Sequence, residues 1–299
     1  MSVRHARKMR EQKYVSEPLR IDYVHSCTST LDILAEPPYD ALEAPFALMT
    51  LDQRAGHGRQ GRRWQNRPGE SLALTVAWPL PAPQLRGWYP LASALAVLDA
   101  CAEVAPGAPL PGLKWPNDIL SPAGEKIAGI LVRVDAGRLL AGVGVNLAGA
   151  IEREREGLEK AATLASLDSR YGTALSDLEG RREFGEVLAR NIARIFALVD
   201  SGGRDFRDLR TRYAVNCLTL GSRVVVVTPA GARYDAHALD VDPTGRLLVE
   251  NAERGRHALD AADVHLARPG GGESPGGQGA KKTKGPDEHR SRSRGAERA

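Results

Sequence analysis

A glycine-rich and arginine-rich stretch is the first part of this sequence that could bind a phosphate group. Residues 56–61 read G-x-G-x-x-G directly after an apolar run, and arginine stands at Arg59, Arg62 and Arg63. Glycine allows backbone N–H groups to come close to an anion, and guanidinium groups bind phosphate oxygens in pairs. The stretch is therefore either a loop that closes over a phosphate-bearing ligand or an ordinary exposed basic hairpin loop.

The same spacing is the fingerprint of dinucleotide-binding folds, but two requirements of those folds are missing. They need a helix that starts at the loop, and this chain continues as RRWQNRPGE, with Pro68 and Gly69 and no helical period. They also need an acidic residue about 20 positions later, and residues 71–98 contain neither Asp nor Glu. Kinase, P-loop and zinc signatures are absent from the sequence as well. We therefore expect a Gly/Arg loop between two strands.

Two further stretches carry charge at places where strands end. KWPND puts Lys114, Asn117 and Asp118 at a strand end and a turn, and GEKIAGIL puts Lys126 just before another strand. Such lysines could face a bound anion. The alternative is that they are solvated charges at a strand edge, which is the usual position of lysine.

Glycines interrupt two neighbouring predicted strands. Gly129 lies in KIAGIL, and Gly142 and Gly144 lie in AGVGVN. Bare backbone in a sheet often marks where a flat ligand lies, although Gly129 alone could mark a bulge.

The elements that would position these residues follow from apolar periodicity. We expect strands over residues 45–51, 71–80, 126–135 and 138–147, the last two joined by a turn at 135–137, and a turn between apolar ends in residues 113–120. We also expect a helix over 87–105 with Leu91, Leu95, Leu98 and Ala102 on one face. Ser176 and Glu179 form a capping box that opens a helix to about Val199, with Phe184, Leu188, Ile192, Ile195 and Val199 in its core stripe.

The texture changes from Gly221, where five short strands separated by Gly and Pro turns predict a small all-β barrel. Residues 269–299 contain Gly, Ser, Arg and Lys with alanine as their only apolar residue, so we expect a disordered tail. Residues 1–20 are expected to form a loose basic arm.

Composition is that of an ordinary globular protein. The 299 residues carry a net charge of +4, and the excess of Lys and Arg lies in the two ends of the chain. Cys27, Cys101 and Cys217 are odd in number and far apart, which argues against a disulfide framework or a metal knuckle. No apolar signal segment and no run of about 18 apolar residues occurs. We expect buried thiols and a cytoplasmic location without membrane contact.

Five motifs, taken together and in order, resemble the bacterial biotin protein ligase family. They are CTSTLD (27–32), DQRAGHGRQGRRW (52–64), LKWPNDI (113–119), EKIAGILV (125–132) and GVGVNL (142–147). The resemblance implies an α+β fold of the class II synthetase type. A catalytic domain with a mixed β-sheet flanked by helices would span residues 21–217, and a small SH3-like β-barrel domain would span 218–268. Only about 20 residues precede Ile21, so we expect the monofunctional type without an N-terminal DNA-binding domain.

What the resemblance implies about activity is specific. The family uses ATP and Mg²⁺ to convert biotin to biotinyl-5′-AMP and pyrophosphate, and then acylates one lysine of a biotin carboxyl carrier domain. That partner belongs to acetyl-CoA, acyl-CoA or pyruvate carboxylase. No specific nucleic acid is expected, and both a monomer and a homodimer stay open.

Site residues are carried over motif by motif. The catalytic residues would be Lys126, Arg59, Arg62 and Asp118, with Lys126 bridging the biotin carboxylate and the α-phosphate and Asp118 near a metal ion or the incoming lysine. Biotin would be bound by Ser29, Thr30, Gln53, Gly129, Gly142 and Gly144. ATP and the adenylate would be bound by Gly56, His57, Gly58, Arg59, Lys114, Asn117, Lys126 and Asn146. Trp64, Ile130 and Leu131 would be apolar walls, although Trp64 could equally be a core residue.

Two positions depart from the family's pattern. Leu31 stands where the family often has asparagine, so a polar ligand to biotin is lost unless Asp32 replaces it. His57 stands where the family often has arginine, and histidine is largely neutral at pH 7. We therefore predict a weaker hold on the adenylate or a stronger pH dependence than arginine would give.

Three other functions remain as alternatives. A lipoate ligase or octanoyl transferase has a similar sheet, but the R-R-x-x-G-G-G stretch usual in those enzymes is missing here. An adenylate-binding protein without transferase activity would fit the two departures. Nucleic-acid binding through the basic ends would be weak and salt-sensitive, because Tyr14 is their only aromatic residue.

Overall fold

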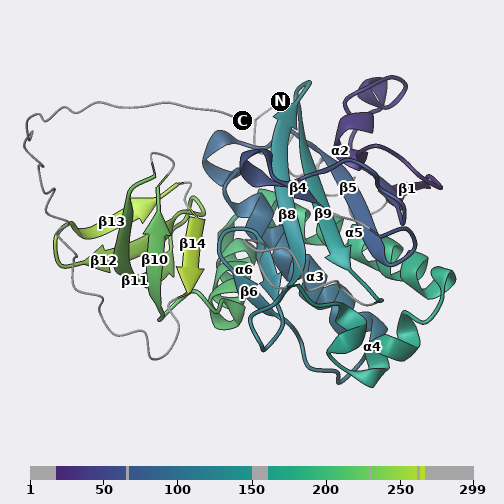
Figure 1. The fold of residues 1–299 in the computed structure, drawn as a ribbon. Coiled ribbons are helices and arrows are strands. Elements are labelled where there is room, and N and C mark those ends of the chain that lie inside the picture. The colour runs from purple at the N-terminus through teal and green to yellow at the C-terminus, as the bar shows by residue number, and fades with distance from the viewer. Residues whose placement is uncertain (1–17, 65–66, 150–160, 229–230, 261–262, 267–299) are drawn as a thin grey trace, which may run out of the picture. The chain divides into compact units, whose positions relative to one another are not determined.

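A seven-stranded mixed sheet forms from the apolar runs, in the order β1-β2-β5-β9-β8-β7-β6 (Figure 1). The strands are β1 (Arg20–Tyr23), β2 (Phe46–Thr50), β5 (Ser71–Pro79), β6 (Gly112–Lys114), β7 (Asp118–Leu120), β8 (Lys126–Asp135) and β9 (Arg138–Asn146). β1 and β2 are parallel and the other neighbours are antiparallel. The computed structural model describes residues 18–64, 67–149, 161–228, 231–260 and 263–266.

Alternation along the central strands separates a core face from an open face. Successive side chains of a strand point to opposite sides of the sheet. In β9, Leu139, Ala141, Val143 and Val145 belong to the large hydrophobic core, whereas Leu140 belongs to a second, smaller cluster. Gly142, Gly144 and Asn146 share the side of Leu140, so the glycines that the sequence singles out lie on the face away from the main core.

Two long helices cover the core face of the sheet (Figure 1). α3 (Trp88–Val104) is buried on nearly every side, but Ala102, predicted on its core face, is exposed. The helix is alanine-rich throughout, so its apolar pattern marks no single stripe. α5 (Leu178–Ser201) buries the five residues of its predicted stripe, which confirms that part of the prediction.

The predicted capping box at Ser176 and Glu179 is wrong by one residue. Asp177 is the N-cap of α5, and its side chain accepts a hydrogen bond from the backbone N–H of Gly180. Aspartate is as good an N-cap as serine. The sequence therefore offered two capping residues side by side, and the pattern alone did not distinguish them.

The smaller cluster lies on the opposite face and is built around α2 (Thr30–Ile33). Leu31 and Leu34 pack with Phe46, Leu48 and Leu140. The buried Arg138 at the start of β9 fixes this segment, because its guanidinium donates hydrogen bonds to the carbonyl oxygens of Leu34, Tyr39 and Leu42 at 2.9 to 3.3 Å.

Besides α2, further helical features were not predicted. α4 (Ser169–Ala174) begins at the N-cap Asp168, and α6 (Gly203–Asn216) buries Phe206, Leu209 and Tyr213. Short 3₁₀ turns occur at Tyr39–Ala41, Arg59–Gly61, Pro83–Leu85 and Leu164–Ser166. The spacing of the apolar residues in α6 is helical, but only one residue per turn is apolar, and that signal is weak.

A second, five-stranded antiparallel sheet follows in the order β13-β12-β11-β10-β14. Its strands are β10 (Arg223–Val227), β11 (Arg233–Val241), β12 (Leu247–Asn251), β13 (Gly255–Leu259) and β14 (Asp263–Leu266), in the places the sequence predicted. Two indole groups contact the turn between β11 and β12 of this sheet. Trp88 Nε1 of α3 donates to the carbonyl oxygen of Asp242, and Trp115 Nε1 of the β6–β7 turn donates to that of Gly245, both at 3.1 Å. A domain boundary between residues 217 and 218 stays a prediction.

Asp242 holds the turn between β11 and β12. Its carboxylate accepts hydrogen bonds from Thr244 and Arg246. Burial alone would raise the pKa of Asp242, but these hydrogen bonds outweigh it and lower the pKa to about 2.

All three cysteines are free and buried, as predicted. Burial raises the pKa of Cys27 to about 11 and that of Cys101 to about 12, so neither thiol ionises near neutral pH. No helix in the described part of the chain is both long and apolar enough to cross a membrane. The predicted tail and residues 1–17 of the predicted arm lie outside the described residues. The last residue of the predicted arm, Arg20, belongs to β1 and pairs with Phe46 of β2.

Candidate active site

A cavity of about 1020 Å³ lies on the open face of the large sheet. Its walls come from α2, from residues 52–74, from the β6–β7 turn, and from β8 and β9. Every site residue predicted from the sequence lines this one cavity: Ser29, Thr30, Gln53, Gly56, His57, Gly58, Arg59, Arg62, Lys114, Asn117, Asp118, Lys126, Gly129, Gly142, Gly144 and Asn146. The fold therefore brings together stretches that are more than 100 residues apart in sequence.

A buried chain of hydrogen bonds sets one end of the cavity. The Thr75 hydroxyl donates to Thr30 Oγ1 at 2.8 Å, Thr30 Oγ1 donates to Gln53 Oε1 at 3.3 Å, and the Thr30 backbone N–H donates to the same oxygen at 2.9 Å. The side-chain amide oxygen of Gln53 is thereby fixed, and its NH₂ group packs against Gly56. A Cβ at Gly56 would lie only 2.4 Å from Gln53 Nε2, so this position requires glycine.

The predicted Gly/Arg loop is a short hairpin, called here the Gly/Arg hairpin (residues 56–64). β3 (Gly56–His57) pairs with β4 (Arg63–Trp64), with Gly56 opposite Trp64 and His57 opposite Arg63. No α-helix starts there, as the sequence predicted. Arg59 Nη1 donates to Asn117 Oδ1 at 3.0 Å, so the tip of the hairpin reaches the β6–β7 turn across the cavity.

Two side chains of the protein lie over the bare backbone of the glycines. The indole of Trp64 lies over Gly144, where an added Cβ would come within 2.4 Å of Trp64 Cε2, and also contacts the site of a Cβ on Gly129. Leu31 lies over Gly142, where an added Cβ would come within 2.8 Å of Leu31 Cδ1. Trp64 Nε1 is buried without a hydrogen-bond partner among the described residues, so a bound ligand could supply one.

Charges at the other end of the cavity are closely paired. Lys126 Nζ lies 2.6 Å from Asp118 Oδ1, and Lys114 Nζ lies 3.6 Å from Asp118 Oδ2. The side chains of Lys114 and Asp118 are each 11% exposed, so this pair is largely removed from water. Removing one partner from such a group leaves a poorly solvated charge, which is costly.

The two asparagines are oriented by backbone groups. Asn117 Nδ2 donates to the carbonyl oxygen of Ile130 at 3.1 Å, and Asn146 Nδ2 donates at 3.3 Å to those of Lys126 and Ala162. Each side-chain amide is thereby held in a fixed orientation at the edge of the cavity.

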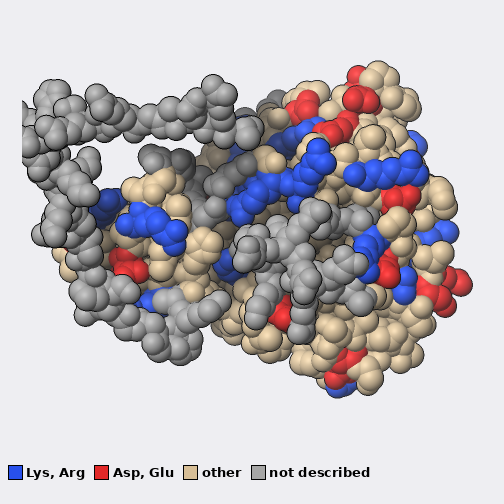
Figure 2. All heavy atoms as spheres, in the orientation of Figure 1, with Lys and Arg blue, Asp and Glu red and all other residues tan. Residues whose placement is uncertain are grey.

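Positive charge dominates the lining. Among the described residues, seven Lys and Arg side chains line the cavity against four carboxylates: Arg54, Arg59, Arg62, Arg63, Arg67, Lys114 and Lys126 against Asp52, Glu70, Asp118 and Glu125. Lys and Arg also gather on the face of the molecule shown in Figure 2. A cavity of this kind attracts polyanions such as nucleoside triphosphates.

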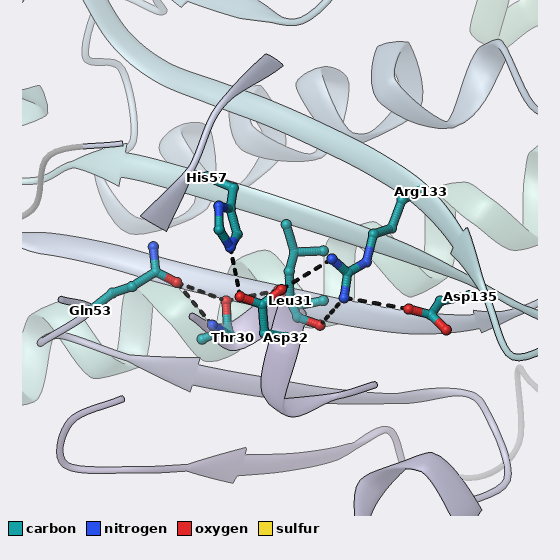
Figure 3. Close-up of polar contacts among 8 residues, drawn as sticks. Thr30, Leu31, Asp32, Gln53, His57, Arg133 and Asp135 are labelled. Atoms are coloured by element: carbon teal, nitrogen blue, oxygen red, sulfur yellow. Dashed lines mark hydrogen bonds and ion pairs between the residues drawn. The ribbon is translucent and has the colours of Figure 1, made fainter. Parts of the chain in front are cut away.

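An ion-pair network behind the Gly/Arg hairpin was not predicted. His57 Nε2 lies 2.6 Å from Asp32 Oδ2, and Arg133 Nη1 lies 3.1 Å from Asp32 Oδ1 (Figure 3). Burial alone would raise the pKa of Asp32, but the hydrogen bonds and charges of His57 and Arg133 outweigh it and lower the pKa. Asp32 is not among the described residues that line the cavity, so the expectation that it could replace the missing polar ligand at Leu31 receives no support.

Known proteins share this combination of sequence and geometry. The profile of the Biotin/lipoate A/B protein ligase family matches residues 23–149. Over 254 residues the chain is 35% identical to the biotin--[acetyl-CoA-carboxylase] ligase of Mycobacterium tuberculosis, which covers 83% of this chain and 89% of that protein.

The chain belongs to the biotin protein ligase family. A second relative, the biotin--[acetyl-CoA-carboxylase] ligase of Paracoccus denitrificans, is 29% identical over 225 residues, which cover 73% of this chain and 88% of that protein. Family membership confirms the resemblance drawn from the five motifs.

The fold is that of solved biotin protein ligases. The structure of the enzyme from Aquifex aeolicus in complex with biotin and ATP matches with a TM-score of 0.66 at 22% identity, covering 84% of this chain and 99% of that one. The predicted α+β class, with a mixed sheet flanked by helices and a small β domain after it, is confirmed.

The sequence did not reveal three residues at the site. Thr163 lines the cavity from the segment after β9, and His265 lines it from β14 in the second sheet. Thr75 in β5 supports Thr30 by a hydrogen bond. None of the three lies in a motif, and the fold alone brings them to the site.

The donor set does not fit a protein-built magnesium site. In the described segments no three His, Cys, Asp or Glu side chains come close enough together to hold a metal ion. Asp118 is the predicted metal ligand, and its two carboxylate oxygens face Lys126 and Lys114.

Proposed function

We propose that this chain is a biotin protein ligase, which activates biotin with ATP and transfers it to a lysine of a carrier protein. The observation that carries the proposal is the single cavity in which all five family motifs meet, with Lys126 close to Gly129 and to the Gly/Arg hairpin. Two relatives over most of the chain's length bear the name biotin--[acetyl-CoA-carboxylase] ligase, which supports biotin over lipoate as substrate.

In the first step a carboxylate oxygen of biotin attacks the α-phosphorus of ATP. A new O–P bond forms, the bond from that phosphorus to the bridging oxygen breaks, and pyrophosphate leaves. Both reactants are anions, so a fixed cation between them lowers the barrier. Lys126 is proposed for this role, and Arg59 and Arg62 add positive charge from the Gly/Arg hairpin. Because Lys126 is already held by Asp118, the cation is in place before substrate arrives.

In the second step the amine of the carrier lysine attacks the carbonyl carbon of biotinyl-5′-AMP. The C–N bond forms, the C–O bond to phosphate breaks, and AMP leaves. Asp118 is proposed to lie near the incoming lysine, where a carboxylate favours the approach of an ammonium group and can accept its proton. Its present partners, Lys114 and Lys126, would share that charge with the substrates.

A mixed anhydride hydrolyses when water reaches it, so the cavity must exclude water during the reaction. Trp64, Ile130 and Leu131 line the cavity as apolar walls. The Gly/Arg hairpin covers its other side through the contact of Arg59 with Asn117. These residues are proposed to protect the adenylate until the carrier arrives.

The proposal extends to the carrier protein and to the metal ion. The carrier is proposed to be a biotin carboxyl carrier domain of an acyl-CoA or pyruvate carboxylase. Mg²⁺ is proposed to arrive with ATP, bound mainly by phosphate oxygens and water, as is usual for this ion.

Biotin-dependent exchange of pyrophosphate into ATP tests the first step. Exchange with biotin but not with lipoate is expected, and Lys126→Ala should lower its rate by about 100- to 1,000-fold, the range for removal of one transition-state contact. Arg204→Ala is the matched control, because Arg204 is 86% exposed on α6, and it should leave the rate unchanged. Exchange with lipoate would favour the lipoate alternative, and silence with both acids would favour a protein that only binds an adenylate.

A further inference from the structure

Contacts among His57, Asp32 and Arg133 join the Gly/Arg hairpin to α2 and to strand β8 of the large sheet. His57 belongs to β3, Asp32 to α2, and Arg133 to β8. Their side chains form one continuous line from the hairpin to the sheet, in which His57 Nε2 lies 2.6 Å from Asp32 Oδ2 and Arg133 Nη1 lies 3.1 Å from Asp32 Oδ1 (Figure 3).

The sheet side of this line is held firmly. Arg133 Nη2 donates to the carbonyl oxygen of Leu31 at 2.9 Å and lies 3.5 Å from Asp135 Oδ2, while Arg138 binds three carbonyl oxygens of the segment that follows α2. Asp32 is therefore presented at a fixed place. The hairpin, in contrast, has only two-residue strands, so its position depends on contacts such as this one.

A second contact holds the opposite side of the hairpin. Arg59 Nη1 donates to Asn117 Oδ1 at 3.0 Å, near the charged end of the cavity. The pair of His57 and Asp32 lies beside the end formed by Thr30 and Gln53 (Figure 3). The hairpin is thus fastened at two points, one toward each end of the cavity.

We propose that Asp32 and Arg133 are positioning residues that, through His57, fasten the Gly/Arg hairpin over the bound adenylate and so set how long the adenylate stays on the protein. Neither carboxylate oxygen of Asp32 needs to touch the ligand, because Asp32 does not line the cavity in the described residues. The inference rests on the proposed function for the identity of the ligand, but the contact itself is a property of the ligand-free chain.

Release of biotinyl-5′-AMP from preformed complex, followed after addition of excess unlabelled biotin and ATP, tests the proposal. His57 and Asp32 are 48% and 37% exposed, so solvent weakens their pair. Asp32→Asn and His57→Ala should each speed release about 2- to 5-fold, the effect of a partly exposed ion pair. The double variant should release no faster than either single variant, because both remove the same contact.

Matched controls and a rescue make the test specific. Asp208→Asn and His237→Ala make the same chemical changes at exposed positions outside the cavity and should leave release unchanged. Asp32→Glu keeps the carboxylate and should release the adenylate more slowly than Asp32→Asn, and His57→Arg keeps a donor beside Asp32 and should keep release slow. Unchanged release in Asp32→Asn, or effects of the two single variants that multiply, would overturn the proposal.

Trypsin gives a readout that needs no ligase activity. The hairpin contains Arg59, Arg62 and Arg63, and cleavage at these bonds in the ligand-free protein can be identified by mass spectrometry. Asp32→Asn should speed this cleavage and Asp208→Asn should not. If the wild-type protein lacked pyrophosphate exchange while Asp32→Asn was still cleaved faster than Asp208→Asn, the proposed function would fail but the contact between the hairpin and Asp32 would be supported. Equal cleavage rates in the two variants would contradict the proposed role of Asp32, whether or not the protein has ligase activity.

Discussion

Alanine in place of Gly144 would put a methyl group where the indole of Trp64 now lies. The added Cβ would be 2.4 Å from Trp64 Cε2 and 2.8 Å from Trp64 Cζ2 and Nε1, whereas ordinary contact begins at 3.4 Å. The indole must therefore move by about 1 Å. Such overpacking costs about 1–3 kcal/mol. Because Trp64 pairs with Gly56 in the Gly/Arg hairpin, the shift is passed to the hairpin and so to the end of the cavity assigned to biotin.

Titration calorimetry with biotin measures the effect. Gly144→Ala should weaken biotin binding about 5- to 150-fold, which corresponds to that cost. Gly172→Ala is the matched control, because the nearest atom to its added Cβ is the carbonyl oxygen of Ala165 at 3.9 Å and α4 accepts alanine readily. Biotin affinity within 2-fold of wild type in Gly144→Ala, with an unchanged melting temperature, would refute the placement of Trp64 over Gly144.

Stability depends on two further residues outside the cavity. Arg138→Met keeps the volume of the side chain but removes the donor from one buried carbonyl oxygen, that of Leu34, and from two partly buried ones, those of Tyr39 and Leu42. The free energy of unfolding should therefore fall by about 2–4 kcal/mol in denaturant titration, and an unchanged value would contradict the role of Arg138. The pKa of Asp242 is lowered to about 2, so its stabilising effect is present above the ordinary pKa near 4 and is lost as pH falls through about 2. Asp242→Asn should therefore be less stable than wild type at pH 6, and the difference should shrink by pH 2; a difference independent of pH would contradict this account.

Much of the sheet could be predicted from sequence because its strands are apolar on both faces or alternate cleanly. β8 runs from Lys126 to Asp135, as predicted, since charged residues and the turn at Ala136 and Gly137 define its ends. Short elements were missed because they contain too few residues to show an apolar period. α2 has only four residues and begins within a motif, so nothing in its period marks it as a helix.

The site divides in the same way. The residues carried over from the motifs all line one cavity, and their individual roles stay predictions. The sequence named Asp32 only as a possible replacement for a biotin ligand and did not mark Arg133, because the contacts of both residues depend on the fold. Nor did the glycines by themselves show that Trp64 and Leu31 would occupy the space over them. That arrangement depends on which side chains the hairpin and α2 bring to the sheet, and no local sequence pattern shows this.

Transfer of biotin to a carrier tests the central claim most directly. The chain is incubated with ATP, Mg²⁺, a purified biotin carboxyl carrier domain and either biotin or lipoate, and the intact mass of that domain is measured. We predict the addition of one biotinyl group at a single lysine, dependent on ATP and absent when Lys126→Ala replaces the wild-type protein. A carrier domain that stays unmodified while the protein still forms biotinyl-5′-AMP, or one that is modified with lipoate in place of biotin, would contradict the account.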